Sequence, residues 1–528
     1  MHTDKQTLDS GNPVISGWLP TLIVFSLTVI LVGACVHGNY RFFYDDAFIT
    51  LRYARHLIAG AGPIWNLQGP RVEGFSSPLH LLLISATGAM GVPLLYAARI
   101  VNTISHTLLV VFVFFYLRRH AGTFGGLLGA MLIASSWMFI VWDLGGLDEI
   151  LYACLNTIGV LTGLRYLDSA EPRRERFLFS GVALLAIATL ARPEGSLLLA
   201  GLWVVGLVAP KPADGNRWRP AVVSASIGIL ILLPMVLFRW FYFHEIAPNT
   251  MYAKMGGISP TELLAAGARY LLNFLLTPPF LGVGAGIAAL FCLARRCFTS
   301  VEAGLWWFIG LIAFFPLVSG GDHMIAFRFC IPMYSLFAVV LVRHLSNLGV
   351  LRQPDLMPVF IGLLFTVLAF QTRTVKLNPR YADPAASVGQ VVGEYIRDHW
   401  KPNSVVALNT AGATPFFSDS MQYIDMLGLN DLEIARRKDI PREGPWTQRI
   451  GHLKGDGASV LARHPDYIIL GPADGTTVEL KLKAFFLGDY ELANSPQFQR
   501  DYKPCIVALP KDVTFTFYKN IALGTSCP

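Results

Sequence analysis

Residues 44–55 read YDDAFITLRYAR, and they come soon after a long apolar segment at residues 18–36. A run of about 17 to 25 apolar residues is long enough to cross a lipid bilayer. Charged side chains at the end of such a segment are costly near lipid and therefore mark functional cavities. This stretch predicts a membrane protein with a site where its first apolar segment ends.

The composition of the whole chain also predicts a membrane protein. Of 528 residues, 53% are hydrophobic and 15% are charged, whereas globular proteins carry about 25% charged residues. These values exclude disordered and collagen-like chains, and seven cysteines are too few for a disulfide scaffold of this length. The net charge of +7 comes from basic residues dispersed between apolar segments, so we expect membrane lipid and no nucleic acid as a partner.

The charged residues are distributed unevenly along the chain. Residues 372–528 hold 18 Lys and Arg and 17 Asp and Glu, about 22% of that part, whereas residues 1–371 are about 11% charged. We therefore predict a transmembrane domain over residues 1–371 and a soluble domain over residues 372–528. In the second part, an amphipathic helix at 387–400 and buried strands at 404–409 and 467–472 predict a small α/β module.

Eleven apolar segments are predicted to cross the membrane. They are residues 18–36, 93–117, 124–141, 150–167, 177–191, 196–208, 221–243, 279–293, 301–318, 330–342 and 356–370. The apolar stretch 78–90 is short for a crossing, so we predict a re-entrant or interfacial helix there. Basic clusters at 118–120, 173–176, 211–219, 295–296 and 343–352 fall on alternate connections, which predicts a cytoplasmic N-terminus and an extracytoplasmic C-terminal domain.

With this topology, the polar and ionisable residues of the loops collect on the outer face. Such residues at the ends of apolar helices are candidates for substrate binding. They are Arg52, Arg55, Glu73, Asp148, Glu149, Arg192, Glu194, Asn249, Tyr252, Lys254, Asp322, His323 and Arg328.

Asp45 and Asp46 are the candidate catalytic residues. Adjacent side chains diverge in a helix or a strand, so one carboxylate is expected to face the pocket and the other to support it. The first would deprotonate a hydroxyl group or stabilise a developing positive charge. The alternative is that an aspartate caps a helix predicted over residues 47–57.

The cations of the outer loops fit an anionic ligand. Arg52 and Arg55 share a helix face, and Lys254, Arg192 and Arg328 are predicted on the same side of the membrane. A guanidinium group suits a phosphate. The alternative for each is an ion pair with a carboxylate such as Asp148, Glu149, Glu194 or Asp322.

The sequence contains little that predicts a cofactor. Asp322 and His323 are too few to form a metal site, so we expect no cofactor, although a divalent cation stays open. His323 is either a hydrogen-bonding group or a ligand. There is no Walker A or G-x-G-x-x-G pattern, so nucleotide-driven transport and dehydrogenase chemistry lack support. A lipid-linked phosphosugar would supply the energy for a transfer at the outer face.

Taken together, these motifs resemble the multi-spanning glycosyltransferases of the C superfold (GT-C), above all the terminal arabinofuranosyltransferases. The stretches that carry the resemblance are DDAFI at 45–49, YAR at 53–55, WN at 65–66, RVEGFSSPL at 71–79, GLDE at 146–149, RPEG at 192–195, PNTMYAK at 248–254, GGDHM at 320–324 and IDMLGLND at 424–431. In the family, Trp often stands where this chain has His323.

The resemblance implies an enzyme of the bacterial inner membrane. It would move a sugar, with arabinofuranose as the expected sugar, from a polyprenyl-phosphate donor to a glycan or protein acceptor of the cell envelope. An aspartate of the first loop, Asp45 or Asp46, would lie near the reacting centre. The alternatives from other classes are a transporter or flippase of lipid-linked glycans, for which we find no internal repeat, and a non-catalytic envelope protein.

Cys505 and Cys527 are the two cysteines of the C-terminal part. Because an oxidising compartment favours pairing, we predict a disulfide between them.

Overall fold

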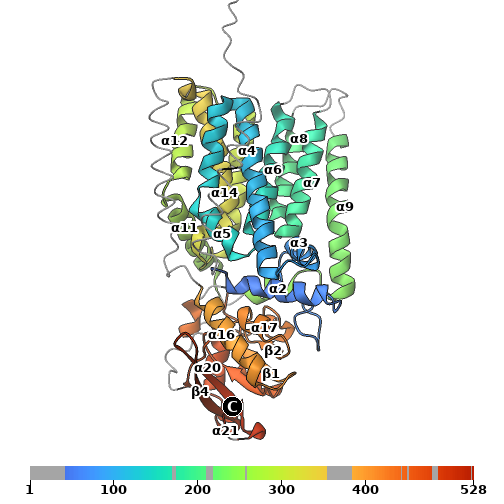
Figure 1. Cartoon of the computed structure of the whole chain (residues 1–528). Helices are drawn as coiled ribbons and strands as arrows, with labels where there is room; N and C mark the ends of the chain where they lie inside the picture. The colour runs from blue at the N-terminus through green and yellow to red at the C-terminus, as the bar shows by residue number, and fades with distance from the viewer. Residues whose placement is uncertain are drawn as a thin grey trace, which may run out of the picture.

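The computed structural model describes residue 26 and residues 42–168, 174–209, 218–255, 258–353, 383–441, 443–448, 451–478, 486–524 and 526–527. It consists of a helical bundle and a smaller α/β part that lies beyond one end of the bundle (Figure 1). The predicted boundary at residue 371 falls outside the described residues, and so do the predicted spans 18–36, except for residue 26, and 356–370.

The bundle is built from apolar helices. They are α4 (Leu94–Ala134), α5 (Trp137–Gly145), α6 (Glu149–Asp168), α7 (Glu175–Ala191), α8 (Gly195–Val208), α9 (Trp218–Tyr242), α11 (Pro260–Leu275), α12 (Leu281–Ala294), α13 (Ser300–Ser319) and α14 (Ile331–Asn347), with the 3-10 turns η1 (Ile325–Cys330) and η2 (Val350–Arg352). Five described helical segments are long and apolar enough to cross a membrane: Leu94–Ala134, Glu149–Asp168, Trp218–Tyr242, Ser300–Ser319 and Ile325–Asn347. The count of eleven crossings stays a prediction.

Two parts of the bundle differ from the sequence-based prediction. The predicted span 124–141 is divided, because α4 ends at Ala134 and α5 starts at Trp137. Helix α11 was absent from the predicted spans because it is amphipathic, and it begins with a capping box in which Ser259 and Glu262 bond each other's backbone N–H groups.

Short helices and polar loops cover the end of the bundle that faces the α/β part. Helix α2 (Asp45–Ile58) runs across this end next to α3 (Pro78–Ala89) (Figure 1). The short helix α10 (Asn249–Lys254) contacts the α/β part. The opposite end holds a different set of polar contacts, among them Arg343 with Glu302 at 2.6 Å and His120 with Asn347 at 3.0 Å.

The α/β part has one five-stranded sheet in the order β2-β1-β3-β5-β4. Strands β1 (Val405–Leu408), β2 (Gln422–Asp425) and β3 (Tyr467–Ile469) are parallel, and β4 (Tyr502–Leu509) and β5 (Val513–Asn520) form an antiparallel pair. The helices are α16 (Pro384–His399), α17 (Ala413–Phe417), α18 (Leu432–Ala435), α19 (Gly457–Ala462), α20 (Leu487–Ala493) and α21 (Pro496–Asp501), with 3-10 turns η5 (Pro445–Gln448) and η7 (Ile521–Leu523). A disulfide joins Cys505 on β4 to Cys527.

Candidate active site

Helix α2 connects the bundle to the α/β part through its basic face. Arg52 is fully buried, and its guanidinium group donates to the Trp65 carbonyl at 2.7 Å and to the Pro415 carbonyl. Arg55 donates to the Phe416 carbonyl at 2.7 Å. The Asp419 carboxylate forms ion pairs with both guanidinium groups, at 3.4 Å from Arg52 and 3.7 Å from Arg55.

These contacts correct the prediction that Arg52 binds substrate, because Nε, NH1 and NH2 of this fully buried group all donate to backbone carbonyls of the interface. Arg55 donates through one nitrogen and keeps other N–H groups, so its role in substrate binding stays a prediction. The two arginines dock the α/β part onto α2.

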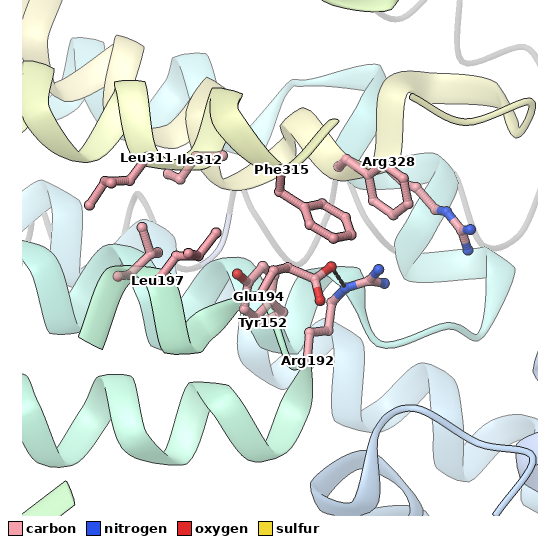
Figure 2. A pocket seen from close by; sticks show the side chains of 10 residues that line it. Tyr152, Arg192, Glu194, Leu197, Leu311, Ile312, Phe315 and Arg328 are labelled. Carbon is pink, nitrogen blue, oxygen red and sulfur yellow. Dashed lines mark hydrogen bonds and ion pairs between the residues drawn. The ribbon is translucent and has the colours of Figure 1, made fainter. Parts of the chain in front are cut away.

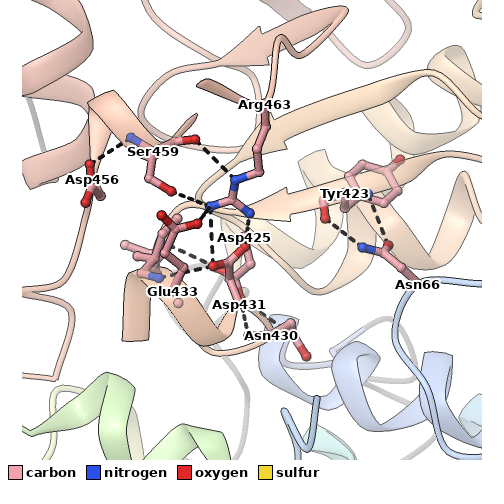
Figure 3. A network of polar contacts seen from close by, with 12 residues as sticks. Asn66, Tyr423, Asp425, Asn430, Asp431, Glu433, Asp456, Ser459 and Arg463 are labelled. Carbon is pink, nitrogen blue, oxygen red and sulfur yellow. Dashed lines mark hydrogen bonds and ion pairs between the residues drawn. The ribbon is translucent and has the colours of Figure 1, made fainter. Parts of the chain in front are cut away.

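The same interface engages several other residues that the motifs singled out. Asn66 exchanges two hydrogen bonds with the backbone of Tyr423, at 2.8 and 3.0 Å (Figure 3). The side-chain amide of Asn249 donates to the carbonyls of Gly428 and Leu429 at 2.8 and 3.0 Å. Asn249 is thus a docking residue rather than the predicted substrate ligand.

Glu73 and Tyr252 also have partners within the protein. Glu73 is buried, and its carboxylate accepts two hydrogen bonds from the guanidinium group of Arg239, which lies near the end of α9. Nε donates to one carboxylate oxygen and NH2 to the other, each at 2.8 Å. Tyr252 lies under the Arg436 guanidinium group, 5.1 Å from the ring centre. The carboxylate of Glu73 is therefore occupied, which corrects the prediction that it binds substrate, while the hydroxyl of Tyr252 has no described partner.

Asp45 is buried at the junction of α2 with the α/β part. Its carboxylate accepts from the Ala413 N–H at 2.8 Å, and its own N–H donates to Asp383 at 2.8 Å. It caps no helix of its own, since α2 starts at Asp45 with no side-chain cap. Burial and the neighbouring Asp383 raise the pKa of Asp45 to about 8. This environment gives Asp45 a docking role.

Asp46 is half-buried, and its side chain diverges from that of Asp45 because adjacent residues on a helix point in different directions. Its carboxylate acts electrostatically on Lys254, His323 and His452. Within the described part of the chain, neither the Asp46 carboxylate nor the Lys254 ammonium group has a hydrogen bond or an ion pair. The surrounding protein and the charge of Arg328 lower the pKa of Lys254, although its side chain is exposed to solvent. A cation that solvent reaches and that has no partner among the described residues is available to bind an anion.

A second set of charges lies next to this group inside the bundle. Arg192 contacts Glu194 at 2.7 Å, Glu149 at 3.0 Å and Asp148 at 3.3 Å. Arg328 lies 3.6 Å from Glu149 and also pairs with Asp322. The predicted cations Arg192 and Arg328 are therefore in the ion pairs that were the alternative to phosphate binding.

This network borders a narrow pocket that has one apolar end. Leu197, Leu311 and Ile312 line one part of the pocket, and Arg192, Glu194 and Arg328 line the other (Figure 2). One carboxylate oxygen of Asp148 and one of Glu149 are buried without a hydrogen-bond partner in the described part of the chain. The pocket has a volume of about 10 Å³, room for about one water, between its charged end and its apolar end.

Asp322 and His323 form the outer boundary of the same network. Burial alone would raise the pKa of Asp322, but the neighbouring cation of Arg328 holds it below its usual value. His323 lies 3.4 Å from Asp322. Among the described residues, no group of three or more His, Cys, Asp or Glu side chains is arranged to hold a metal ion.

Sequence reasoning missed three residues of this region. Asp419 and Asp383 bind the basic face and the first turn of α2, and His452 lies against His323 with ring centres 4.9 Å apart. No motif surrounds them, because they act through contacts between segments far apart in the chain. A single histidine in a loop, seen in one sequence, does not indicate a binding site.

The chain is similar to one family model and to a characterised glycosyltransferase. Residues 379–518 match a family model described as a domain of unknown function (DUF8728). The chain is 26% identical over 340 residues to the terminal beta-(1->2)-arabinofuranosyltransferase of Mycobacterium tuberculosis, over 57% of this chain and 52% of the relative. The chain thus spans about half the length of this curated relative.

One solved structure with the same architecture is that of ArnT from Cupriavidus metallidurans bound to undecaprenyl phosphate. Its TM-score is 0.57 at 11% sequence identity, and the match covers 97% of this chain and 100% of that one. The oligosaccharyltransferase of Archaeoglobus fulgidus, in complex with Zn and sulfate, has a TM-score of 0.58 and 13% identity, covering 95% of this chain and 73% of that one. The chain has the GT-C fold. The predicted fold class and the resemblance to the terminal arabinofuranosyltransferases are confirmed, and the chain is a membrane protein.

Proposed function

We propose that this protein is a membrane glycosyltransferase that moves a sugar, arabinofuranose, from a polyprenyl-phosphate donor to an acceptor of the bacterial cell envelope. The acceptor is a glycan or a protein at the outer face of the inner membrane. The similarity to a terminal arabinofuranosyltransferase supports the reaction and the sugar. The undecaprenyl phosphate named for a protein of the same fold supports the class of donor.

The observation that carries the proposal is that the Asp46 carboxylate acts electrostatically on the Lys254 ammonium group while neither has a hydrogen bond or ion pair to any residue that the structure describes. The acceptor hydroxyl oxygen forms a bond to the anomeric carbon, and its proton passes to Asp46. The bond from the anomeric carbon to the phosphate oxygen breaks, and the polyprenyl phosphate leaves with both electrons. Lys254 pairs with this phosphate, which is anionic both in the bound donor and after the bond breaks.

The remaining site residues position these two groups and complete the donor site. Arg328 pairs with Asp322 and Glu149, which orders the loop on which His323 lies. Asp148 and Glu149 pair with Arg192, and Glu149 also with Arg328, which fixes these two cations at the polar end of the pocket. Asp45 holds the α/β part against α2 and is not the base.

We place the α/β part on the extracytoplasmic side of the inner membrane. Its disulfide between Cys505 and Cys527 supports this location, because disulfides persist in oxidising compartments. The alternation of basic loops in the sequence supports the same orientation.

Lipid extracts of a deletion strain test the proposed function. We expect mass spectrometry to find accumulated polyprenyl-phosphate pentose, which the wild-type gene removes and the Asp46→Asn variant does not. The purified protein in detergent should transfer the labelled sugar to envelope material of the deletion strain. Wild-type protein that transfers no sugar in detergent, where no membrane separates two compartments, would contradict the enzyme and favour a transporter.

A further inference from the structure

The loop at residues 451–456 of the α/β part carries one side chain to the candidate active site. The His452 ring lies edge-on against His323, with ring centres 4.9 Å apart and planes at 80°. His323 belongs to the loop between α13 and η1 in the bundle. The two imidazoles therefore come from the two parts of the molecule and meet beside Asp46 and Lys254.

The protein holds this loop firmly in place. Leu453 is buried in a cluster with Trp446 and Leu487, against which Ile258 of the bundle side also packs. Lys454 donates to the Arg437 carbonyl at 2.6 Å. His452 is thus presented from a fixed backbone, which favours a binding role over a surface position.

The ring nitrogens of the pair are largely free. Nδ1 of His323 lies 3.4 Å from Asp322. The other three nitrogens have no hydrogen-bond partner among the residues that the structure describes. His452 is half-buried, so a ligand that enters from outside can reach it.

The pair is suited to hydroxyl groups rather than to phosphate. Burial and the neighbouring His323 lower the pKa of His452 to about 4, and burial also lowers the pKa of His323. Both rings are therefore neutral at pH 7, and a neutral imidazole offers one donor and one acceptor. A sugar hydroxyl donates and accepts in the same way, whereas a phosphate is bound better by a cation such as Lys254.

We propose that His452, paired with His323, binds hydroxyl groups of the acceptor glycan and thereby makes the α/β part a component of the acceptor site. This inference rests on the proposed function. The acceptor chain enters between the two parts of the molecule, and His452 holds its terminal sugar so that the reacting hydroxyl reaches Asp46. His452 is a positioning residue and takes no proton in the reaction.

Two substitutions at this position separate hydrogen bonding from packing. His452→Phe keeps an aromatic ring against His323 and removes both nitrogens, while His452→Gln keeps a donor and an acceptor and removes the ring. His399→Phe is the matched control, because His399 is an exposed histidine of α16 in the α/β part and its ring forms a hydrogen bond with the Tyr395 carbonyl.

The assay uses the full-length protein in detergent, polyprenyl-phosphate arabinofuranose as donor and glycan extracted from the envelope of the deletion strain as acceptor. We expect His452→Phe to raise the KM for the acceptor about tenfold, with kcat and the KM for the donor changed less than twofold. His452→Gln should restore most of the acceptor affinity, and the control should match wild type.

The outcomes distinguish the inference from the proposed function. Wild-type protein without transfer would refute the proposed function itself. Active wild type together with a His452→Phe variant of unchanged acceptor KM would refute only the inference. Equal losses in the Phe and Gln variants, or a fall in kcat with unchanged KM, would also overturn it, because they would indicate packing or a chemical role.

Discussion

Asp45 makes the stability of this protein depend on pH in a direction that is opposite to the usual one for a carboxylate. Its pKa is about 8 in the folded protein and about 4 in an unfolded chain. The folded protein therefore holds a proton that the unfolded chain has lost at any pH between these values. The stabilising contribution is complete below the unfolded pKa and is lost as the pH rises through the folded pKa.

The size of the effect follows from the same two values. Unfolding releases close to one proton from Asp45 at pH 6 to 7 and about half a proton at pH 8, and one pH unit per proton corresponds to about 1.4 kcal/mol. Wild-type protein should thus lose about 2.5 kcal/mol of unfolding free energy between pH 6 and pH 8.5 through this group alone. Asp45→Asn cannot titrate, and its amide oxygen still accepts from the Ala413 N–H.

Thermal unfolding in detergent at pH 6 and pH 8.5 measures this difference. We expect the melting temperature of wild type to fall by a few degrees more than that of Asp45→Asn over this range. Comparing the two proteins cancels the other titrating groups, such as Asp425 and Asp489. Parallel pH profiles for the two proteins would show that Asp45 is ionised in the folded state and would refute this account of the docking interface.

Three further predictions concern docking, donor binding and the disulfide. A side chain at Gly412 would collide with the Asp45 carbonyl, so Gly412→Ala should loosen the α/β part and speed its tryptic digestion, while Gly488→Ala on α20, whose new side chain would meet only ordinary contacts of 3.7 Å or more, should not. Lys254→Met should raise the KM for the donor about 10- to 100-fold in the transfer assay with little change in kcat, because it removes a charged hydrogen bond to the phosphate; an unchanged donor KM would contradict this role. Cys505→Ser opens a loop that spans 22 residues and should cost about 3 kcal/mol of stability, measured by denaturant unfolding of the α/β signal, and reduced wild type should behave like the variant.

The sequence predicted the parts of the fold that rest on local patterns. Long apolar runs predicted most of the described bundle helices, short apolar runs ended by turn residues predicted β1 and β3, and an amphipathic pattern predicted α16. The divergence of Asp45 and Asp46 followed from helix geometry. Helix α11 was missed because its apolar residues occupy one face, which lowers its overall hydropathy.

The roles of the charged residues could not be predicted in the same way. Arg52 and Arg55 have the chemistry of phosphate ligands, but their partners Pro415, Phe416 and Asp419 lie more than 360 residues away in sequence. A single sequence shows that a charge is present and does not show which partner it meets. His452 is absent from the sequence-based site for the same reason.

The central claim is that Asp46 is the base of a sugar transfer, and the transfer rate of Asp46→Asn tests it most directly. Purified wild type, Asp46→Asn and the exposed-site control Asp398→Asn are compared with labelled donor and saturating acceptor, after thermal unfolding has shown that all three are folded. We expect kcat of Asp46→Asn to fall by about 10² to 10⁴, the usual share of a general base, while the control keeps the wild-type rate. A folded Asp46→Asn protein that transfers sugar at a near-normal rate would contradict the account.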